Sequence, residues 1–171
     1  YAIFTNVLKF KTWIKFLRVV DIEEEEEIEC GVMSSSSGLI QGGEYSSQRE
    51  FPWLASIVDS TYNRMNTSGA LISHKHVVTR GNAVSFESAY SNGGFIAYAL
   101  TGMKVYLGVL RHDGDSAPGS VVINPKEIRL HPDIQKVQDN FKNNVALIYV
   151  EKSVQYSDVI RAVCLWTFND D

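Results

Sequence analysis

Short apolar runs rich in valine and isoleucine recur along the chain, and clusters of Gly, Ser, Asn and Asp separate them. This pattern predicts β-strands joined by turns, and it indicates an all-β sandwich or barrel rather than a helical or alternating fold. No period of roughly 20 to 50 residues recurs, so a repeat architecture is not expected. The predicted strands are Leu54 to Val58, Ala70 to Ile72, His76 to Val78, Lys104 to Leu107 and Val145 to Val150.

The first thirty residues carry a different pattern. Four apolar residues lie at a spacing that would place them on one face of a helix, interleaved with basic residues. A basic amphipathic helix can bind a membrane surface or a polyanion. The alternative, which we favour, is the end of an upstream domain or a badly predicted exon. The apolar residues are Phe10, Trp13, Ile14 and Leu17, and the basic ones are Lys9, Lys11, Lys15 and Arg18.

Length and charge limit the function classes. The 171 residues with 44% apolar content suffice for one hydrophobic core. The net charge of -4 gives no support to nucleic-acid binding, which would need a clustered basic surface. No apolar run is long enough to cross a bilayer, so membrane insertion is not expected, and no signal peptide is visible.

Six sequence blocks follow one another in an order and spacing that resemble the first half of a chymotrypsin-family, trypsin-like serine protease domain. The first contains Ile-Gln-Gly-Gly followed by Phe-Pro-Trp, and the fifth reads Asn-Asn-Val-Ala-Leu where the family has Asn-Asp-Ile-Ala-Leu. The last block, together with the Trp166 that follows it, ends in Val-Cys-Leu-Trp and is similar to secreted arthropod modular proteases. The blocks are Leu39 to Leu54, Thr67 to Thr79, Val105 to Gly108, Glu127 to Pro132, Asn143 to Leu147 and Val154 to Leu165.

The resemblance implies a fold and a domain order. We expect the first six-stranded antiparallel Greek-key β-barrel of the two-barrel trypsin-like fold, with the second barrel missing from this chain. Residues 1–29 would be a pro-segment or upstream remnant, partly helical, and residues 30–38 a Ser-rich linker. The barrel would occupy residues 39–165, and residues 166–171 would be a truncated interbarrel linker.

The same alignment places two asparagines at catalytic positions. Asn82 stands where the family has its histidine base, and Asn144 stands where it has its aspartate. A serine nucleophile needs an imidazole to take its proton and a carboxylate to orient and stabilise the imidazolium, and an amide can do neither. No Gly-Asp-Ser-Gly-Gly occurs in the sequence, so the nucleophile region is absent as well. We therefore expect that this chain has no intact catalytic residue.

The remaining histidines do not replace the base. His74, His76, His112 and His131 are scattered, and we interpret them as structural or solvated residues. Their spacing also differs from metal-ligand motifs such as His-Glu-x-x-His, so no metal or cofactor is expected.

Two further features concern the compartment. The resemblance implies that Cys30 and Cys164 form the disulfide that joins the pro-segment to the end of the first barrel, which requires an oxidising environment. Two reduced thiols in a cytosolic protein are the alternative. Asn66-Thr67-Ser68 is a sequon, so Asn66 is a candidate for N-glycosylation in a secreted protein.

The resemblance thus predicts a secreted, catalytically inactive serine protease homologue with a binding or regulatory role in an extracellular proteolytic cascade. Its partners would be proteins, namely a protease, a substrate or an inhibitor. The alternative is an incomplete piece of an active trypsin-like endopeptidase. A third interpretation is a piece with no stable fold, because half of a two-barrel domain would expose an apolar face.

Overall fold

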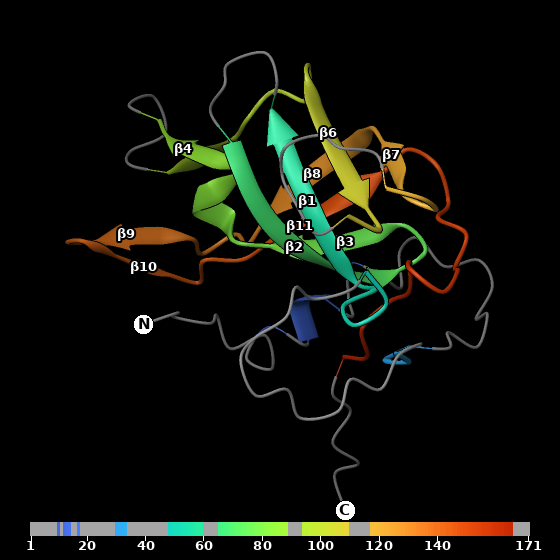
Figure 1. Cartoon of the computed structure of the whole chain (residues 1–171). Coiled ribbons are helices and arrows are strands. Elements are labelled where there is room, and N and C mark those ends of the chain that lie inside the picture. Colours follow the sequence, from blue (N-terminus) through green and yellow to red (C-terminus); the bar gives the residue numbers. More distant parts are fainter. Residues whose placement is uncertain are drawn as a thin grey trace, which may run out of the picture.

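The computed structural model describes residues 10, 12–14, 17, 30–33, 48–59, 65–88, 94–109 and 117–165. Within these residues the regular secondary structure is almost entirely β, arranged as one strongly curved antiparallel sheet with two small hairpins beside it (Figure 1). Residues 12–14 and 17 are helical, and a 3₁₀ turn, η2, spans Gly81–Ala83. The Ser-rich residues 34–38 and the predicted interbarrel linker 166–171 lie outside the described residues.

The strands take up the apolar runs and several polar segments between them. The curved sheet contains β1 (Leu54–Asp59), β2 (Met65–Ser73), β3 (His76–Thr79), β6 (Met103–Leu107), β7 (Val121–Ile123), β8 (Pro125–Leu130) and β11 (Ala146–Val150). The hairpins are β4 (Ser85–Glu87) with β5 (Phe95–Ala97), and β9 (Gln135–Val137) with β10 (Asn140–Lys142).

The strand order closes the sheet into a barrel. The order is β7-β6-β1-β2-β3-β11-β8, and every pairing is antiparallel. The two terminal strands, β7 and β8, follow one another directly in the chain and are separated only by Asn124. If β7 and β8 are counted as one interrupted strand, the sheet has six strands. This strand pairs with β6 at one end of the order and with β11 at the other, so the sheet is closed. The predicted six-stranded antiparallel barrel is therefore confirmed.

Alternation along the strands fills the barrel interior, because successive side chains of a strand point to opposite faces. From β1, Ala55 and Ile57 are completely buried, and β6 contributes Met103, Val105 and Leu107 in the same way. Burying aliphatic side chains stabilises a fold by roughly 1.5 to 3 kcal/mol each relative to exposing them. The other buried members of this inner cluster are Leu71, Val77, Val84, Ala146, Ile148, Val150, Val154 and Ile160.

A second apolar cluster lies on the outside of the barrel. It is built on the outward-facing residues of β3 and β11 and their neighbours, and it is covered by residues of the N-terminal segment together with Val163 and Leu165. Figure 1 shows the helical turn of that segment, in blue, outside the curved sheet. We call this the outer cluster. Its buried members are Phe10, Ile14, Ile72, Val78, Val145, Leu147 and Tyr149.

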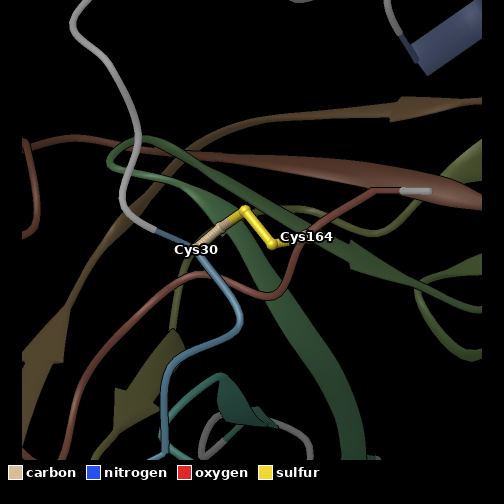
Figure 2. Close-up of a disulfide and its surroundings, with 2 residues drawn as sticks. All are labelled: Cys30 and Cys164. Atoms are coloured by element: carbon tan, nitrogen blue, oxygen red, sulfur yellow. A yellow bond between two sulfur atoms is a disulfide. The ribbon is translucent and has the colours of Figure 1, made fainter. Parts of the chain in front are cut away.

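A disulfide bond ties the N-terminal segment to the chain that follows β11. Cys30 and Cys164 are bonded across a sequence separation of 134 residues, with their Cα atoms 4.9 Å apart (Figure 2). The pairing implied by the resemblance is thus present. Gly31 adopts a φ of +70°, and a Cβ atom there would lie 2.9 Å from the sulfur of Cys164, so the bridge approaches the backbone too closely for any other residue. The Gly31 N–H donates to the carbonyl oxygen of Ala162 at 2.8 Å.

Candidate functional site

Asn82 lies at the centre of the η2 turn, directly after β3. The turn closes with the N–H of Val84 donating to the carbonyl oxygen of Gly81, while the Ser85 hydroxyl donates to the same oxygen at 2.8 Å. Val84 is buried in the inner cluster. The sequence therefore fixes Asn82 at the rim of the barrel, where its side chain is only partly buried.

Asn144 reaches the same place from a distant part of the chain. It lies between the β9–β10 hairpin and β11, after Asn143, whose φ of 49° turns the backbone. The side chain of Asn143 donates to the carbonyl oxygen of Asp133 at 3.0 Å and holds this turn against the loop after β8. Asparagine tolerates the left-handed region better than most residues, which suits position 143.

The two candidate residues, 62 positions apart, are joined by a reciprocal pair of hydrogen bonds. The backbone N–H of Asn82 donates to Oδ1 of Asn144 at 2.7 Å, and Nδ2 of Asn144 donates to Oδ1 of Asn82 at 2.8 Å. Because a backbone N–H can only donate, the first bond fixes which end of the Asn144 amide is oxygen. The second bond then requires the Asn82 oxygen to face Asn144. We call this arrangement the amide pair.

The amide pair has no proton to move. A carboxamide is neither a base nor an acid near neutral pH, and the donor and acceptor atoms in contact already match. An aspartate at 144 would place a carboxylate oxygen opposite the Asn82 oxygen, which is repulsive unless the Asn82 amide turns over. The amide pair therefore has a structural role: it links η2 to the start of β11 by hydrogen bonds.

Because Gly81 has no side chain, the amide pair can lie close to the loop after β8. A Cβ atom at position 81 would lie 2.5 Å from Cδ1 of Ile134, 3.2 Å from the carbonyl oxygen of Val145 and 3.4 Å from Oδ1 of Asn144. The first distance is far inside van der Waals contact, so an alanine would push Ile134 or η2 aside. Sequence reasoning did not single out Gly81, because only the fold brings Ile134 against it.

The described histidines lie in three separate structural settings, and His131 is treated below with the N-terminal segment. His74 uses Nδ1 to contact the carbonyl oxygen of Val154 at 2.7 Å and stacks on Tyr156. His76 is buried, with Nδ1 2.5 Å from the Ser73 hydroxyl and its ring against Tyr149. These contacts hold both rings to parts of the barrel other than the amide pair. His112 lies outside the described residues.

The Ser73–His76 contact was not singled out from the sequence, and it has the chemical types of a nucleophile and its base. Both side chains are buried, Ser73 with 6% and His76 with 3% of its surface exposed, so a substrate has no access to the hydroxyl. The Ser73 oxygen also accepts the N–H of Lys75 at 3.2 Å, which shapes the turn between β2 and β3. The contact is therefore a turn element.

His131 lies between the barrel and the N-terminal segment. Its ring contacts those of Phe10 and Trp13, with centroids 5.2 and 5.0 Å apart, and its Nδ1 accepts the N–H of Asp133 at 3.2 Å. Burial lowers the pKa of His131 from its ordinary value of 6.5, while the nearby Asp133 carboxylate acts in the opposite direction. His131 is thus favoured in its neutral form.

No group of three or more His, Cys, Asp or Glu side chains converges as a metal site in the part of the chain that the structure describes. No helix among those residues is both long and apolar enough to cross a membrane. The sequon residue Asn66 lies in β2, opposite Val58 of β1, and Ser68 is exposed. Glycosylation of Asn66 stays a prediction.

A family model described as Trypsin matches residues 40–171, which is most of the chain. The chain belongs to the trypsin family. A CLIP domain-containing serine protease B8 of Anopheles gambiae is 26% identical over 144 residues, covering 80% of this chain and 35% of the relative. Melanization protease 1 of Drosophila melanogaster is 29% identical over 141 residues, covering 75% and 34%. The Spaetzle-processing enzyme of the same fly is 24% identical over 153 residues, covering 81% and 36%.

This trypsin-family chain spans about a third of the length of these curated relatives. Its fold, its family and the similarity to arthropod serine proteases agree with the sequence-based interpretation. The barrel also brings Asn82 and Asn144 together, and their assignment to the histidine and aspartate positions stays a prediction.

Proposed function

We propose that this protein is a catalytically inactive, secreted serine protease homologue that acts by binding other proteins of an extracellular proteolytic cascade. The observation that carries the proposal is the amide pair. Asn82 and Asn144 contact each other at the two positions that the family resemblance assigns to the base and its carboxylate partner.

The chemical argument is that neither amide of the pair can take up or release a proton near neutral pH. In trypsin, exchanging the aspartate alone for asparagine lowers turnover by about four orders of magnitude, because the histidine takes the wrong tautomer. Here the base position is also an amide, so no group at the pair can accept the proton of a serine hydroxyl. Oxyanion stabilisation and binding alone leave only residual catalysis.

The retained barrel supports a binding role. The disulfide, η2 and the closed barrel form although the two residues of the pair are amides. Such a barrel can present a surface to another protein without any catalytic group, because function depends on the site rather than on the fold. The names of the relatives, a melanization protease and a Spaetzle-processing enzyme, favour a partner that is itself a protease, its substrate or its inhibitor.

The first test is the sequence of the full-length transcript through codons 82 and 144 and past codon 171. Asparagine at both codons supports the proposal. Histidine and aspartate codons, together with a downstream Gly-Asp-Ser-Gly-Gly, would overturn it and make the chain part of an active trypsin-like endopeptidase. The relatives' names as proteases are the observation that favours this second function.

The second test is chemical. Protein from the full-length transcript is incubated with a fluorophosphonate that labels activated serines, with trypsin as the positive control. We expect no labelling of the native protein, or of the N82H and N144D single variants, because each variant still lacks one partner. Labelling of the native protein, at a rate within a hundredfold of trypsin, would contradict the proposal.

A further inference from the structure

The side chain of Asn82 ends in one polar atom that the amide pair does not use. Its Oδ1 accepts the hydrogen bond from Nδ2 of Asn144, so Nδ2 of Asn82, on the other side of the same planar amide, points away from Asn144. This nitrogen has no hydrogen-bond partner among the described residues, and the half-buried side chain leaves it in contact with solvent. The amide pair therefore presents to its surroundings an atom that can only donate.

This polarity is opposite to the one that proton transfer needs. A histidine base offers a lone pair to the hydroxyl of a nucleophile, whereas an amide nitrogen offers two N–H groups and no lone pair. The orientation is also fixed, because the N–H of Asn82 holds Oδ1 of Asn144, and the Asn144 amide in turn holds Oδ1 of Asn82. A ligand at this place must therefore supply a hydrogen-bond acceptor.

Two exposed cations stand beside the amide pair. Arg80 precedes η2 in extended conformation, two residues before Asn82, and Lys142 ends β10, two residues before Asn144. Figure 1 shows the green turn of η2 next to the base of the β9–β10 hairpin, in agreement with the hydrogen bonds of the pair. Within the described part of the chain neither cationic side chain has a hydrogen bond or an ion pair. Their charge therefore favours an acceptor that is negatively charged.

The carboxylate of Asp133 lies toward another part of the rim. Asp133 belongs to the loop after β8, where its carbonyl oxygen accepts a hydrogen bond from Asn143. Burial lowers the pKa of His131, and the Asp133 carboxylate raises it in part, so this carboxylate is within reach of His131. Because His131 contacts the N-terminal segment on the outside of the barrel, the Asp133 charge acts on that side.

The charges between the two hairpins offset each other. The rings of Phe95 in β5 and Phe141 in β10 contact each other, with centroids 5.8 Å apart. Glu87 is the cross-strand neighbour of Phe95, and Lys136 is the cross-strand neighbour of Phe141, so one charge of each sign flanks the aromatic contact. The net positive charge next to the amide pair therefore comes from Arg80 and Lys142.

We propose that Asn82, Arg80 and Lys142 form a binding site, the rim site, for an acidic segment of a partner protein. A carboxylate of that segment accepts a hydrogen bond from Nδ2 of Asn82, and the two cations attract it and a second acidic side chain. The chain as a whole carries a net charge of -4, which repels acidic segments elsewhere, so the attraction is local. The rim site rests on the proposed binding role and names the chemistry of the partner.

The experiment titrates the nitrogen-15-labelled full chain with the peptide acetyl-Gly-Glu-Glu-Gly-amide and follows the side-chain amide signals by NMR. Asn82→Ala identifies the Asn82 signals, and acetyl-Gly-Gln-Gln-Gly-amide is the control peptide of the same shape without charge. We expect saturable shifts of the Asn82 signals at low salt, with a dissociation constant on the order of 1 mM, as suits a few exposed contacts. Binding of the Gln peptide should be weaker by about tenfold, and added salt should weaken only the Glu peptide.

Variants of the full chain test each part of the rim site. Asn82→Asp still accepts from Nδ2 of Asn144 but turns a carboxylate oxygen outward, so it should abolish binding. Asn144→Asp should do the same, because the Asn82 amide then turns over and presents its oxygen. Arg80→Gln and Lys142→Gln should each weaken binding by about threefold. Lys152→Gln is the matched control, because Lys152 is exposed beyond the opposite end of β11.

Equal binding of the two peptides, an equal loss in Lys152→Gln, or no saturable shift of the Asn82 signals would overturn the rim site. Sodium acetate at the same carboxylate concentration should shift these signals less by about threefold, because it cannot engage both cations at once. An equal shift would overturn the assignment to a protein segment. A chain that binds no acidic peptide and is not labelled by the fluorophosphonate lacks the rim site alone, whereas a labelled chain contradicts the proposed function alone.

Discussion

The two faces of β11 make the most instructive comparison in this molecule. Ala146, Ile148 and Val150 point into the barrel, whereas Leu147 and Tyr149 point outward. Both faces are buried to a similar degree. The inward face is covered by other strands of the same sheet. The outward face is covered by the N-terminal segment, more than 120 positions away in the sequence, and by Val163 and Leu165.

The difference shows how far local pattern and tertiary contact each determine burial. The inward residues follow from strand alternation, in which every second side chain faces the core. The outward residues break the alternation and make Val145 to Val150 a continuous apolar run, which indicates a strand covered on both sides. One face therefore depends on the barrel alone, and the other depends on the barrel, the N-terminal segment and the disulfide.

Removing the disulfide should have the largest effect on the free energy of unfolding. In Cys30→Ser with Cys164→Ser, the chain-entropy argument for a separation of 134 residues gives a loss of about 4 to 5 kcal/mol in the free energy of unfolding. Urea denaturation of the purified chain measures it. Met33→Ser, at an exposed neighbouring position, is the control and should change stability by less than about 0.5 kcal/mol. A loss below about 1 kcal/mol would show that the bridge contributes little.

Alanine at two neighbouring positions of β11 separates the two faces directly. Ile148→Ala should lower the free energy of unfolding by about 3 kcal/mol, because the cavity opens inside a closed barrel. Leu147→Ala should cost about 2 kcal/mol, because the covering segment can shift or leave. Hydrogen exchange should then show loss of protection at residues 12–17 for Leu147→Ala but not for Ile148→Ala. The reverse pattern would mean that we have assigned the faces wrongly.

The amide pair should contribute less than either cluster. Asn144→Ala should cost about 2 kcal/mol, because it leaves the N–H of Asn82 without its acceptor, and Asn82→Ala about 1 kcal/mol, because that N–H keeps its partner. The double variant should then cost less than the sum of the two, and thermal or urea unfolding of all four proteins completes the cycle. Strict additivity would show that the two side chains do not interact.

The smallest expected effect is a pH dependence of the outer face. Because burial lowers the pKa of His131 below 6.5, the folded chain favours the neutral ring. The contribution of the His131 ring to stability is fully present above pH 6.5, where the ring is neutral in the folded and the unfolded chain. It is lost as the pH falls through the interval between 6.5 and the lowered pKa.

Hydrogen exchange at residues 12–17 should therefore speed up between about pH 7.5 and pH 5, after correction for the intrinsic pH dependence of exchange. His131→Asn is the matched variant, because an amide oxygen can accept the N–H of Asp133 without titrating. The Asp133 carboxylate reduces the shift, so Asp133→Asn should enlarge it. An identical pH profile in wild type and His131→Asn would rule out His131 as the cause.

The sequence predicted the inner architecture well. The five predicted strands correspond to β1, β2, β3, β6 and β11 within a few residues, because their apolar residues face the inner cluster. The strands β4, β5, β7 and β8 were not among those predicted from the apolar pattern, and neither was the hairpin of β9 and β10. Its strands read Gln-Lys-Val and Asn-Phe-Lys, and short, mostly exposed strands have neither alternation nor apolar content to reveal them.

The sequence indicated which residues form the candidate site, but it did not predict the hydrogen bonds between them. Asn82 and Asn144 were identified by resemblance, yet nothing in either local sequence shows that their amides bond to each other. The same is true of the N-terminal segment, whose apolar spacing was recognised while its docking face was not. Periodicity reports which face of an element is apolar, and only the folded chain reports what covers that face.

Asn124 affects whether copies of this barrel can associate through the edges of their sheets. Its side chain accepts a hydrogen bond from Nζ of Lys104 on β6 at 2.5 Å and donates to the Glu151 carboxylate, just after β11, at 3.1 Å, while its carbonyl oxygen accepts the Glu151 N–H. It therefore closes the seam at which the first and last strands of the sheet meet. An open sheet presents a row of unpaired backbone groups on which another chain can add a strand, and a closed one does not. With its main sheet sealed at Asn124, the barrel offers no edge there for a neighbouring copy to extend into a fibril.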